Sequence, residues 1–303
     1  MNTERMMPED IEAIRRDILE HRFSVWDSMM RDLERTADPN RSVVRFPNSS
    51  TYVFSTGPAS FWMMDPCYNL EPCRESERKR IAEMIREKIS FILITHLHED
   101  HCQRALVEDL KDAPIRWVVS ERCRDSFAER FRIPGHRVEV LADGHSAEIS
   151  GIRIESQCGY HDEPGISKVP GCSFDILLPD GIRLFFPSDV RNYGKEIPHR
   201  EQPADYIFGH VFLGREDARG SRFSQLDAFC RFMTCRKSAV LFLTHLYSTG
   251  RLPRDLWTHR HARMIEEKLR TEHPELKIIA PHFGDIVPLV AAARPPAEPP
   301  GRG

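Results

Sequence analysis

The stretch FILITHLHEDHC, residues 91–102, sets four apolar residues directly in front of a run of histidines and an aspartate. Side chains alternate along an extended strand, so His96 and His98 point to the same side, about 6–7 Å apart. Asp100 and His101 follow the strand's end and are able to point at a second position. Two neutral imidazoles and a third ligand from elsewhere are typical of a catalytic zinc that keeps a place for water. The stretch therefore predicts a buried strand that ends in a metal site.

Short β-rich segments and amphipathic helices make up most of the rest of the chain. A helix is predicted over residues 8–36, with an apolar stripe of Ile11, Ile14, Ile18, Val25, Met29 and Leu33. Short strands follow to about residue 65, and helices and strands then mix as far as a last predicted strand at 277–289. The PDG sequence at 179–181 predicts a hairpin turn. This order favours sheets with helices outside them, an α/β or α+β layered fold.

Composition and charge argue against several classes of partner. The net charge of −3 and a pI near 6.5 give no basic field of the kind that nucleic-acid-binding proteins usually carry. No apolar window reaches the roughly 18 residues of a membrane helix, and the charged start lacks a signal-peptide core. The eight cysteines are scattered without a CxxC pair, which favours a reducing compartment. We therefore expect a cytoplasmic protein without a membrane partner.

The stretch THLHEDH, residues 95–101, resembles the signature of the metallo-β-lactamase superfamily of metallohydrolases. The resemblance implies a four-layer αβ/βα sandwich with a two-metal site along the sheet edges. It spans residues 42–290, which leaves 1–41 as an N-terminal helical extension and 291–303 as a Pro/Gly-rich tail that we expect to be disordered. In this family an aspartate at the end of an earlier strand orients the metal-binding loop, and Asp65 in WMMDP stands at that place.

Further ligands of that family have counterparts later in this chain. The resemblance adds His161, in the segment after the predicted strand GIRIESQC, and Asp189, which follows the apolar segment IRLFFPS. Asp189 would bridge two metals, with one carboxylate oxygen on each. The family usually has glycine before this aspartate, whereas this chain has Ser188, a small change. The implied ligands are His96, His98 and His161 for one metal, and Asp100, His101 and a final histidine for the other.

The final histidine has two candidates. His245 ends the apolar strand AVLFLT and precedes a helix and a strand, an order that resembles ribonuclease Z-like members of the family. His282 lies in PHFG, which is similar to a terminal segment of the ascorbate-6-phosphate lactonase-like branch. The order favours His245. His210 is either a site-lining residue or, as its strand favours, a core residue, and we expect His259 and His261 on a charged helix at 254–269 to be solvated.

The resemblance implies a binuclear hydrolase that uses a metal-bound hydroxide on a small ester, lactone or phosphodiester, with Asp100 as a proton donor to the leaving group. Zinc is the expected metal, with Mn²⁺ or Fe²⁺ as alternatives, and flavodiiron members are disfavoured because they carry glutamate where His98 stands. A ribonuclease Z-like nuclease is an alternative, although no Lys/Arg-rich insertion lies between the motifs. Another is a non-catalytic metal-binding regulatory module. The N-terminal helix would then dock a partner or a second copy of the chain.

Overall fold

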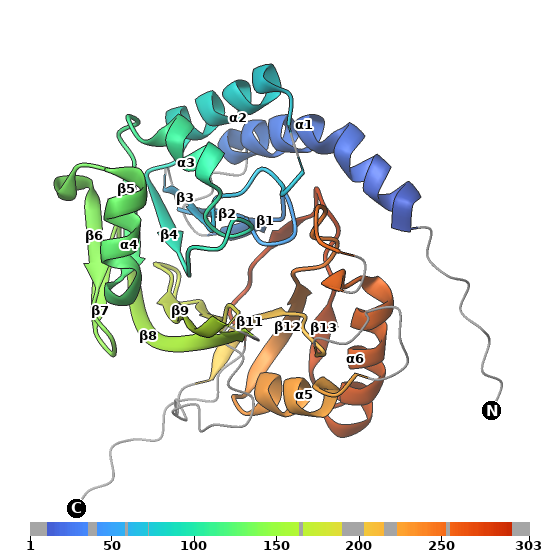
Figure 1. Cartoon of the computed structure of the whole chain (residues 1–303). Coiled ribbons are helices and arrows are strands. Elements are labelled where there is room, and N and C mark those ends of the chain that lie inside the picture. Colours follow the sequence, from blue (N-terminus) through green and yellow to red (C-terminus); the bar gives the residue numbers. More distant parts are fainter. Residues whose placement is uncertain are drawn as a thin grey trace, which may run out of the picture.

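The computed structural model describes residues 11–35, 41–57, 60–71, 73–163, 166–189, 203–214, 223–252 and 255–292. Its strands stack as two sheets, with helices on the outer side of each (Figure 1). No helix in the described part of the chain is both long enough and apolar enough to cross a lipid bilayer. The predicted C-terminal tail lies outside the described residues from position 293 onward, and the predicted helical residues 8–10 also lie outside them.

The described strands form two seven-stranded sheets. The first contains, in spatial order, β14 (Ile286–Pro288), β1 (Ser42–Arg45), β2 (Tyr52–Thr56), β3 (Phe61–Met64), β4 (Phe91–Ile94), β5 (Arg116–Ser120) and β6 (Val138–Leu141). The second contains β13 (Lys277–Ile279), β12 (Ser238–Thr244), β11 (Ala204–His210), β10 (Arg183–Phe186), β9 (Ile166–Leu177), β8 (Ile152–Glu163) and β7 (Ser146–Ile149). Strands β3 to β6 are parallel, as are β10 to β13, so the carboxyl ends of each set share one edge.

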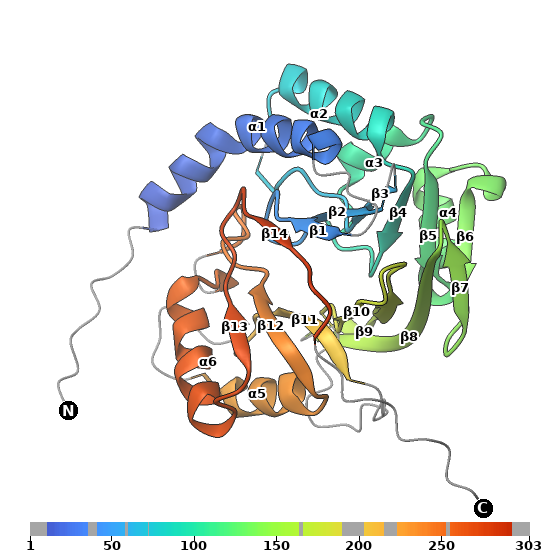
Figure 2. The ribbon, with the colours of Figure 1, turned by 180° about the vertical axis from the view of Figure 1, so that it is seen from behind.

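Helices cover the outer face of each sheet. The first sheet is covered by α1 (Ile11–Arg35), α2 (Glu75–Lys88), α3 (Arg104–Leu110) and α4 (Glu121–Phe131). The second is covered by α5 (Leu226–Thr234) and α6 (His259–Glu272). Figure 2 shows the same arrangement from behind, with both sheets between the two groups of helices. The predicted four-layer αβ/βα sandwich with an N-terminal helix is confirmed.

Three apolar layers hold the sandwich together. Central strands are apolar on both faces because each face packs against another layer. In β4, Ile92 and Ile94 pack against the helices, whereas Phe91 and Leu93 pack between the two sheets. This is the physical reason for the uninterrupted apolar run FILI. Because the strand is held on both faces, the position of the polar residues that follow it is also well defined.

The segment 277–289 is two strands in different sheets, so the prediction of one strand is wrong. β13 pairs with β12 in the second sheet, whereas β14 pairs with β1 in the first. The chain crosses between the sheets through Pro281, which has no N–H to donate to a neighbouring strand, and Gly284, which has a φ of 93°. His282 lies in this crossing and is exposed.

Helix α1 packs on the sandwich of its own chain. Trp26, Met30 and Leu33 are fully buried in the apolar layer beneath the helices of the first sheet. Ile14 and Ile18, nearer the start of the helix, pack against the apolar layer of the second sheet. The helix therefore touches both halves of the sandwich, which favours a structural role over the docking role that was the alternative.

An ion pair between a buried arginine and a partly exposed aspartate joins α1 to β1, and its loss should be costly. Arg45 Nη2 lies 2.8 Å from Asp32 Oδ2, and the Arg45 side chain is 0% exposed. Asp32→Ala leaves this buried guanidinium without its carboxylate, so we expect the free energy of unfolding, measured by chemical denaturation, to fall by roughly 2–3 kcal/mol. Arg31→Ala is the control because Arg31 pairs with Asp27 on the same helix but is 65% exposed, and it should cost at most about 0.5 kcal/mol. Equal losses in the two variants would contradict the prediction.

Candidate metal centre

The carboxyl ends of three neighbouring parallel strands bring polar side chains together in the second sheet. Asp189 lies just beyond β10, His210 is the last residue of β11, and His245 follows β12 directly. The pairing of β11 with β10 and with β12 places these three side chains in that order along the sheet edge. Ligand sites of open α/β sheets lie at such carboxyl ends. Residues far apart in the sequence therefore meet because of strand order.

The first sheet contributes the loop after β4, which Asp65 holds in place. Because β3 and β4 are parallel neighbours, Asp65 after β3 lies beside Thr95 after β4. The Asp65 carboxylate accepts hydrogen bonds from Thr95 N at 2.8 Å and from Thr95 Oγ1 at 2.7 Å. It also accepts one from His101 Nδ1 at 2.8 Å. When the ring is neutral, donation from Nδ1 leaves the Nε2 lone pair of His101 directed into the site, as in many metal-binding histidines.

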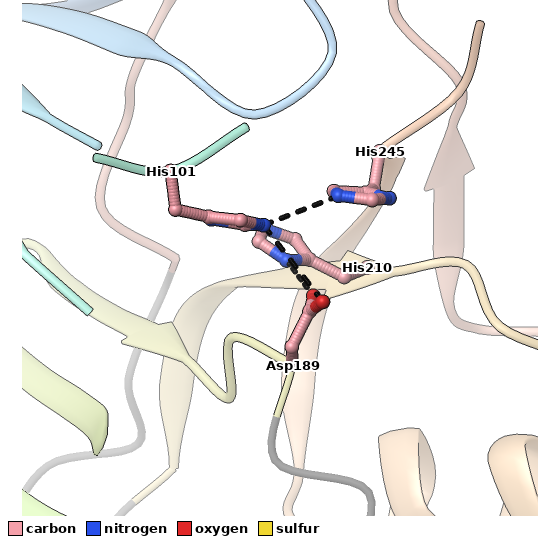
Figure 3. Close-up of side chains that lie close together, drawn as sticks. All are labelled: His101, Asp189, His210 and His245. Carbon is pink, nitrogen blue, oxygen red and sulfur yellow. Dashed lines mark hydrogen bonds and ion pairs between the residues drawn. The ribbon is translucent and has the colours of Figure 1, made fainter. Parts of the chain in front are cut away.

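Four residues from both sheets form a compact group (Figure 3). Each offers one ligand atom, and these atoms all lie within 4.8 Å of one another in His101, Asp189, His210 and His245. The four residues are between 0% and 4% exposed. His101 Nε2 lies 3.2 Å from His245 Nε2, and at this separation both nitrogens cannot carry a proton directed at the other. At least one lone pair is therefore available in the space between the rings.

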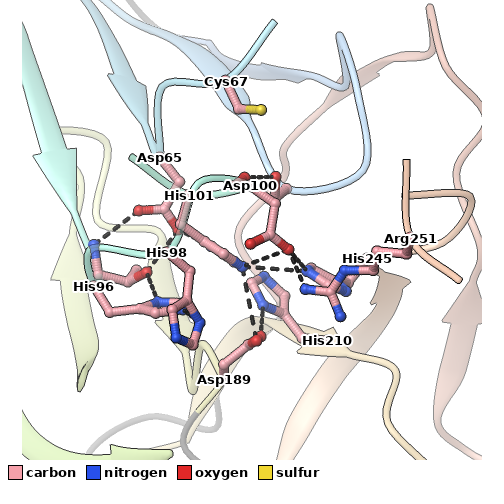
Figure 4. A network of polar contacts seen from close by, with 12 residues as sticks. Asp65, Cys67, His96, His98, Asp100, His101, Asp189, His210, His245 and Arg251 are labelled. Atoms are coloured by element: carbon pink, nitrogen blue, oxygen red, sulfur yellow. Dashed lines mark hydrogen bonds and ion pairs between the residues drawn. The ribbon is translucent and has the colours of Figure 1, made fainter. Parts of the chain in front are cut away.

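His96 and His98, which belong to the other predicted set of imidazoles, adjoin this group (Figure 4). His96 Nε2 lies 3.0 Å from His98 Nδ1, and the ring centroids of His96 and His98 lie 5.7 Å and 4.9 Å from that of His161. His161 Nε2 is 3.3 Å from Asp189 Oδ2. Asp189 thus lies between the two sets, because the same oxygen is 3.8 Å from His101 Nε2. The structure brings together all seven predicted ligands, His96, His98, Asp100, His101, His161, Asp189 and His245.

The backbone is strained at three positions around the site. Asp65, Ser188 and His245 have φ values of 53°, 55° and 64°, in a region that residues other than glycine rarely adopt. Each lies at or just beyond a strand end, where the chain must turn sharply to direct a polar side chain inward. The glycine usual in the resembling family would adopt this φ at position 188 without strain, whereas a serine costs on the order of 1 kcal/mol. The change at Ser188 is therefore not neutral for the backbone.

His210 belongs to the site, although its strand pattern favours a core role. Its Nε2 lies 2.8 Å from the hydroxyl of Tyr52, which donates its own proton to Thr244 Oγ1 at 2.8 Å. On the other side of the ring, His210 Nδ1 lies 2.8 Å from Asp189 Oδ1, so the imidazole bridges the Tyr52 hydroxyl and the Asp189 carboxylate. The sequence does contain a signal for this role. His210 ends an apolar strand that lies, along the chain, between the strands that precede Asp189 and His245.

The electrostatics of the site combine buried carboxylates with Arg251, whose guanidinium contacts Asp100 Oδ2. Burial opposes the ionisation of Asp100, but His101 and Arg251 outweigh it and hold the pKa of Asp100 well below its usual range. Burial also disfavours protonated His101, yet Asp100 and two further carboxylates raise the pKa of His101 to about 9. Burial lowers the pKa of His245 to about 3, which keeps this imidazole neutral. In the absence of a metal, His101 therefore carries a charge that a bound cation would replace.

Three of the histidines discussed in the sequence analysis, His259, His261 and His282, lie away from this cluster. His282 stacks on His259, with ring centroids 4.1 Å apart, in the crossing between β13 and β14. The expectation that His261 is solvated is wrong, because it is 3% exposed. Its Nδ1 accepts a hydrogen bond from Thr258 N at 3.0 Å and completes a capping box, so α6 begins at His259 rather than at residue 254.

The layered fold, together with a buried group of imidazoles and carboxylates at the strand ends, defines a class of α/β sandwich suited to binding metal. Residues 63–246 match the family model of the beta-lactamase superfamily domain. The chain therefore belongs to the metallo-β-lactamase superfamily, as its THLHEDH signature predicts. A comparison with curated protein sequences finds no match.

Several solved structures share this fold. Igni18, a metallo hydrolase from the archaeon Ignicoccus hospitalis, is 13% identical with a TM-score of 0.56, over 83% of this chain and 99% of that protein. YhfI from Bacillus subtilis, a metallo-β-lactamase fold protein, is 12% identical with a TM-score of 0.55, over 82% and 98%. CmlA from Streptomyces venezuelae, a diiron β-hydroxylase, is 13% identical with a TM-score of 0.56, but only 54% of its length is covered. At these identities the likeness shows the fold alone.

Proposed function

We propose that this protein is a binuclear metal-dependent hydrolase that acts on a small ester, lactone or phosphodiester. The observation that carries the proposal is the position of Asp189, whose Oδ2 lies 3.3 Å from His161 Nε2 and 3.8 Å from His101 Nε2. A carboxylate between two sets of imidazoles suits a bridge between two ions. Membership of the superfamily supports a metal-dependent hydrolase, and the number of ions and the substrate are inferences from this geometry.

The donor set fits divalent metal ions. Asp65, Asp100 and Asp189 are between 0% and 4% exposed, and buried carboxylates require positive charge close by. One ligand atom from each of His101, Asp189, His210 and His245 lies within 4.8 Å of the others, a spacing that suits a cation among them. We assign the first ion to His96, His98 and His161, the second to Asp100, His101 and His245, and the bridging position to Asp189.

The ligand chemistry favours zinc, with Mn²⁺ and Fe²⁺ as alternatives, because the set is rich in imidazole and contains no thiolate. When bound, such a pair of ions lowers the pKa of a water molecule and stabilises negative charge on the substrate. The fold likeness to a diiron hydroxylase does not favour iron, since at 13% identity it concerns the fold alone.

Residues of the chain around the ligands would orient them and move protons. His101 and Arg251 keep Asp100 ionised, the state in which it could hold a metal ion, and we assign to the same carboxylate the return of a proton to the leaving group. His210, held by the Tyr52 hydroxyl at 2.8 Å, in turn holds Asp189 Oδ1 at 2.8 Å. This places a protein group on the oxygen of Asp189 that faces away from His161. His210 is therefore proposed as a positioning residue, or as a further ligand through Nδ1.

The charge of the chain suits a small substrate better than a polynucleotide. The net charge of −3 gives no general attraction for nucleic acid. A nuclease and a non-catalytic metal-binding module remain as outcomes of the test below.

The proposal predicts both the metal content and the activity. Protein expressed with added zinc should hold about two ions per chain, measured by elemental analysis, because seven ligands exceed the needs of one tetrahedral ion. It should hydrolyse at least one member of a panel containing an aryl ester, a γ-lactone and bis(p-nitrophenyl) phosphate. Removal of the metal by a chelator should abolish that activity, and zinc should restore it.

Each contrary result identifies a different error. One ion or fewer after zinc-replete expression would contradict the binuclear site. Two ions without turnover of the panel, but with cleavage of a short RNA, would favour the nuclease. Two ions with no turnover of any of these substrates would favour the regulatory module.

A further inference from the structure

Two cysteine thiols face each other across neighbouring strands. Cys158 on β8 and Cys172 on β9 are direct cross-strand partners in the antiparallel register. Their sulfur atoms lie 3.2 Å apart. A disulfide needs about 2.05 Å, so the thiols must approach by little more than one ångström. On one side of the pair the next cross-strand partners are Gly159 and Gly171, so no side chain lies beside the two thiols there.

The backbone geometry of this pair suits a disulfide. The N–H of Cys158 donates to Asp143 Oδ1 at 2.7 Å, and the N–H of Cys172 donates to Thr95 O at 3.0 Å. Neither N–H is used between the two cysteines, so they form a non-hydrogen-bonded pair. In such pairs the Cα atoms are about 4.5 Å apart, at the short end of the roughly 4.4–6.8 Å range that disulfides span.

The two thiols differ in access and in acidity. Cys172 is fully buried, whereas Cys158 is half-buried and can meet a small solute. A hydrogen bond with Cys172 lowers the pKa of Cys158, and Arg122 acts in the same direction. The same hydrogen bond and burial raise the pKa of Cys172. An accessible, more acidic thiol next to a buried one is the arrangement of a reactive cysteine and its resolving partner.

We propose that Cys158 and Cys172 form a redox-active pair that a hydroperoxide oxidises to an intramolecular disulfide. The Cys158 thiolate attacks one oxygen of hydrogen peroxide, the O–O bond breaks, and a sulfenic acid forms as hydroxide leaves and takes up a proton. The Cys172 thiol then attacks the Cys158 sulfur, the S–S bond forms, the S–O bond breaks, and a second water leaves. The two thiols lose two electrons and two protons in total, and the peroxide is reduced to two water molecules.

The disulfide would form beside the proposed metal centre. The Cys172 N–H that donates to Thr95 O joins β9 to the residue directly before His96. Cys158 lies on the same strand as His161. Oxidation would therefore link β8 and β9 covalently at the place where both adjoin the loop after β4. The proposal concerns the thiols and does not depend on the hydrolase assignment.

The test uses the full-length protein and two matched variants. Reduced protein is treated with hydrogen peroxide, free thiols are alkylated, and peptides are mapped by mass spectrometry. We expect a disulfide-linked peptide that joins Cys158 to Cys172, formed before Cys235 is modified although Cys235 is exposed, and reversed by dithiothreitol. Cys158→Ser should lose this peptide, and Cys235→Ser should form it at the rate of the unchanged protein.

A second measurement distinguishes a native disulfide from one formed after unfolding. The oxidised protein should unfold at a temperature roughly 5 °C higher than the reduced protein, because the bond closes a loop in the unfolded chain, and Cys158→Ser should show no such rise. The proposal is overturned if Cys235 oxidises before Cys158. It is also overturned if Cys158 is carried to sulfinic acid while Cys172 stays alkylatable, or if the linked peptide appears only in denatured protein.

Discussion

Replacement of Asp189 by alanine is expected to abolish hydrolysis while most of the fold remains intact. Asp189 follows β10 and faces imidazoles of both proposed sets, at 3.3 Å from His161 Nε2 and 3.8 Å from His101 Nε2. Without it the two ions lose the carboxylate proposed to join them, and the buried positive charge loses its counter-charge. We expect kcat to fall about a thousandfold or more, a loss of roughly 4 kcal/mol of transition-state stabilisation.

Two further variants serve as controls for the Asp189→Ala result. Asp189→Asn keeps the volume and removes the charge, so it should lose nearly as much activity, with a circular dichroism spectrum close to that of the unchanged protein. Asp125→Ala removes an exposed aspartate from α4 and should retain full activity. Near-normal turnover in Asp189→Ala, with two ions still bound, would show that Asp189 serves the backbone turn rather than the metal site.

The final ligand is decided by comparing His245 with His282. His245 Nε2 lies 3.1 Å from Asp100 Oδ2 and 3.2 Å from His101 Nε2, and the residue is 2% exposed. His282 is exposed and stacks on His259. We therefore expect His245→Ala to lose about one of the two ions and most of the activity, whereas His282→Ala keeps both. Elemental analysis of the two variants, purified in parallel, measures the difference.

The backbone at position 245 requires a second variant. His245 has a φ of 64°, which histidine and asparagine adopt more readily than alanine, so His245→Ala adds backbone strain as well as leaving a space beside Asp100. His245→Asn tolerates this φ and fills part of that space, and it should lose the same ion if the imidazole is the ligand. Loss of the ion in His282→Ala, with retention in His245→Ala, would reverse the assignment and favour the lactonase-like arrangement.

Much of the fold could be predicted because its signals are local. The run FILI is apolar at every position because both of its faces are buried, and this pattern is present in the sequence itself. The spacing of His96, His98 and His101 after that strand likewise depends only on local geometry. The family resemblance then supplied the remaining predicted ligands, and the structure places all of these residues in one region. The apolar stripe of α1 was incomplete, since Trp26 and Met30 are buried as well.

Other features depended on contacts between distant segments. The segment 277–289 reads as one β-rich run, but β13 and β14 pair with strands of different sheets, and only that pairing moves His282 away from the centre. The burial of His261 also follows from its tertiary contacts, with its ring centroid 5.5 Å from that of Phe223. In both cases a local pattern fitted two structures equally well.

The sequence by itself determined the layered class of the fold, the strand that leads into the metal-binding motif and the family to which the chain belongs. Only the tertiary structure decided that His210 joins the centre and that Cys158 faces Cys172. The physical reason is that strand order and register decide which of these side chains come into contact. His210 stands between the strands of Asp189 and His245 because β11 pairs with both β10 and β12. Such pairing is a property of the whole sheet, and it cannot be predicted from the residues next to His210 in the sequence.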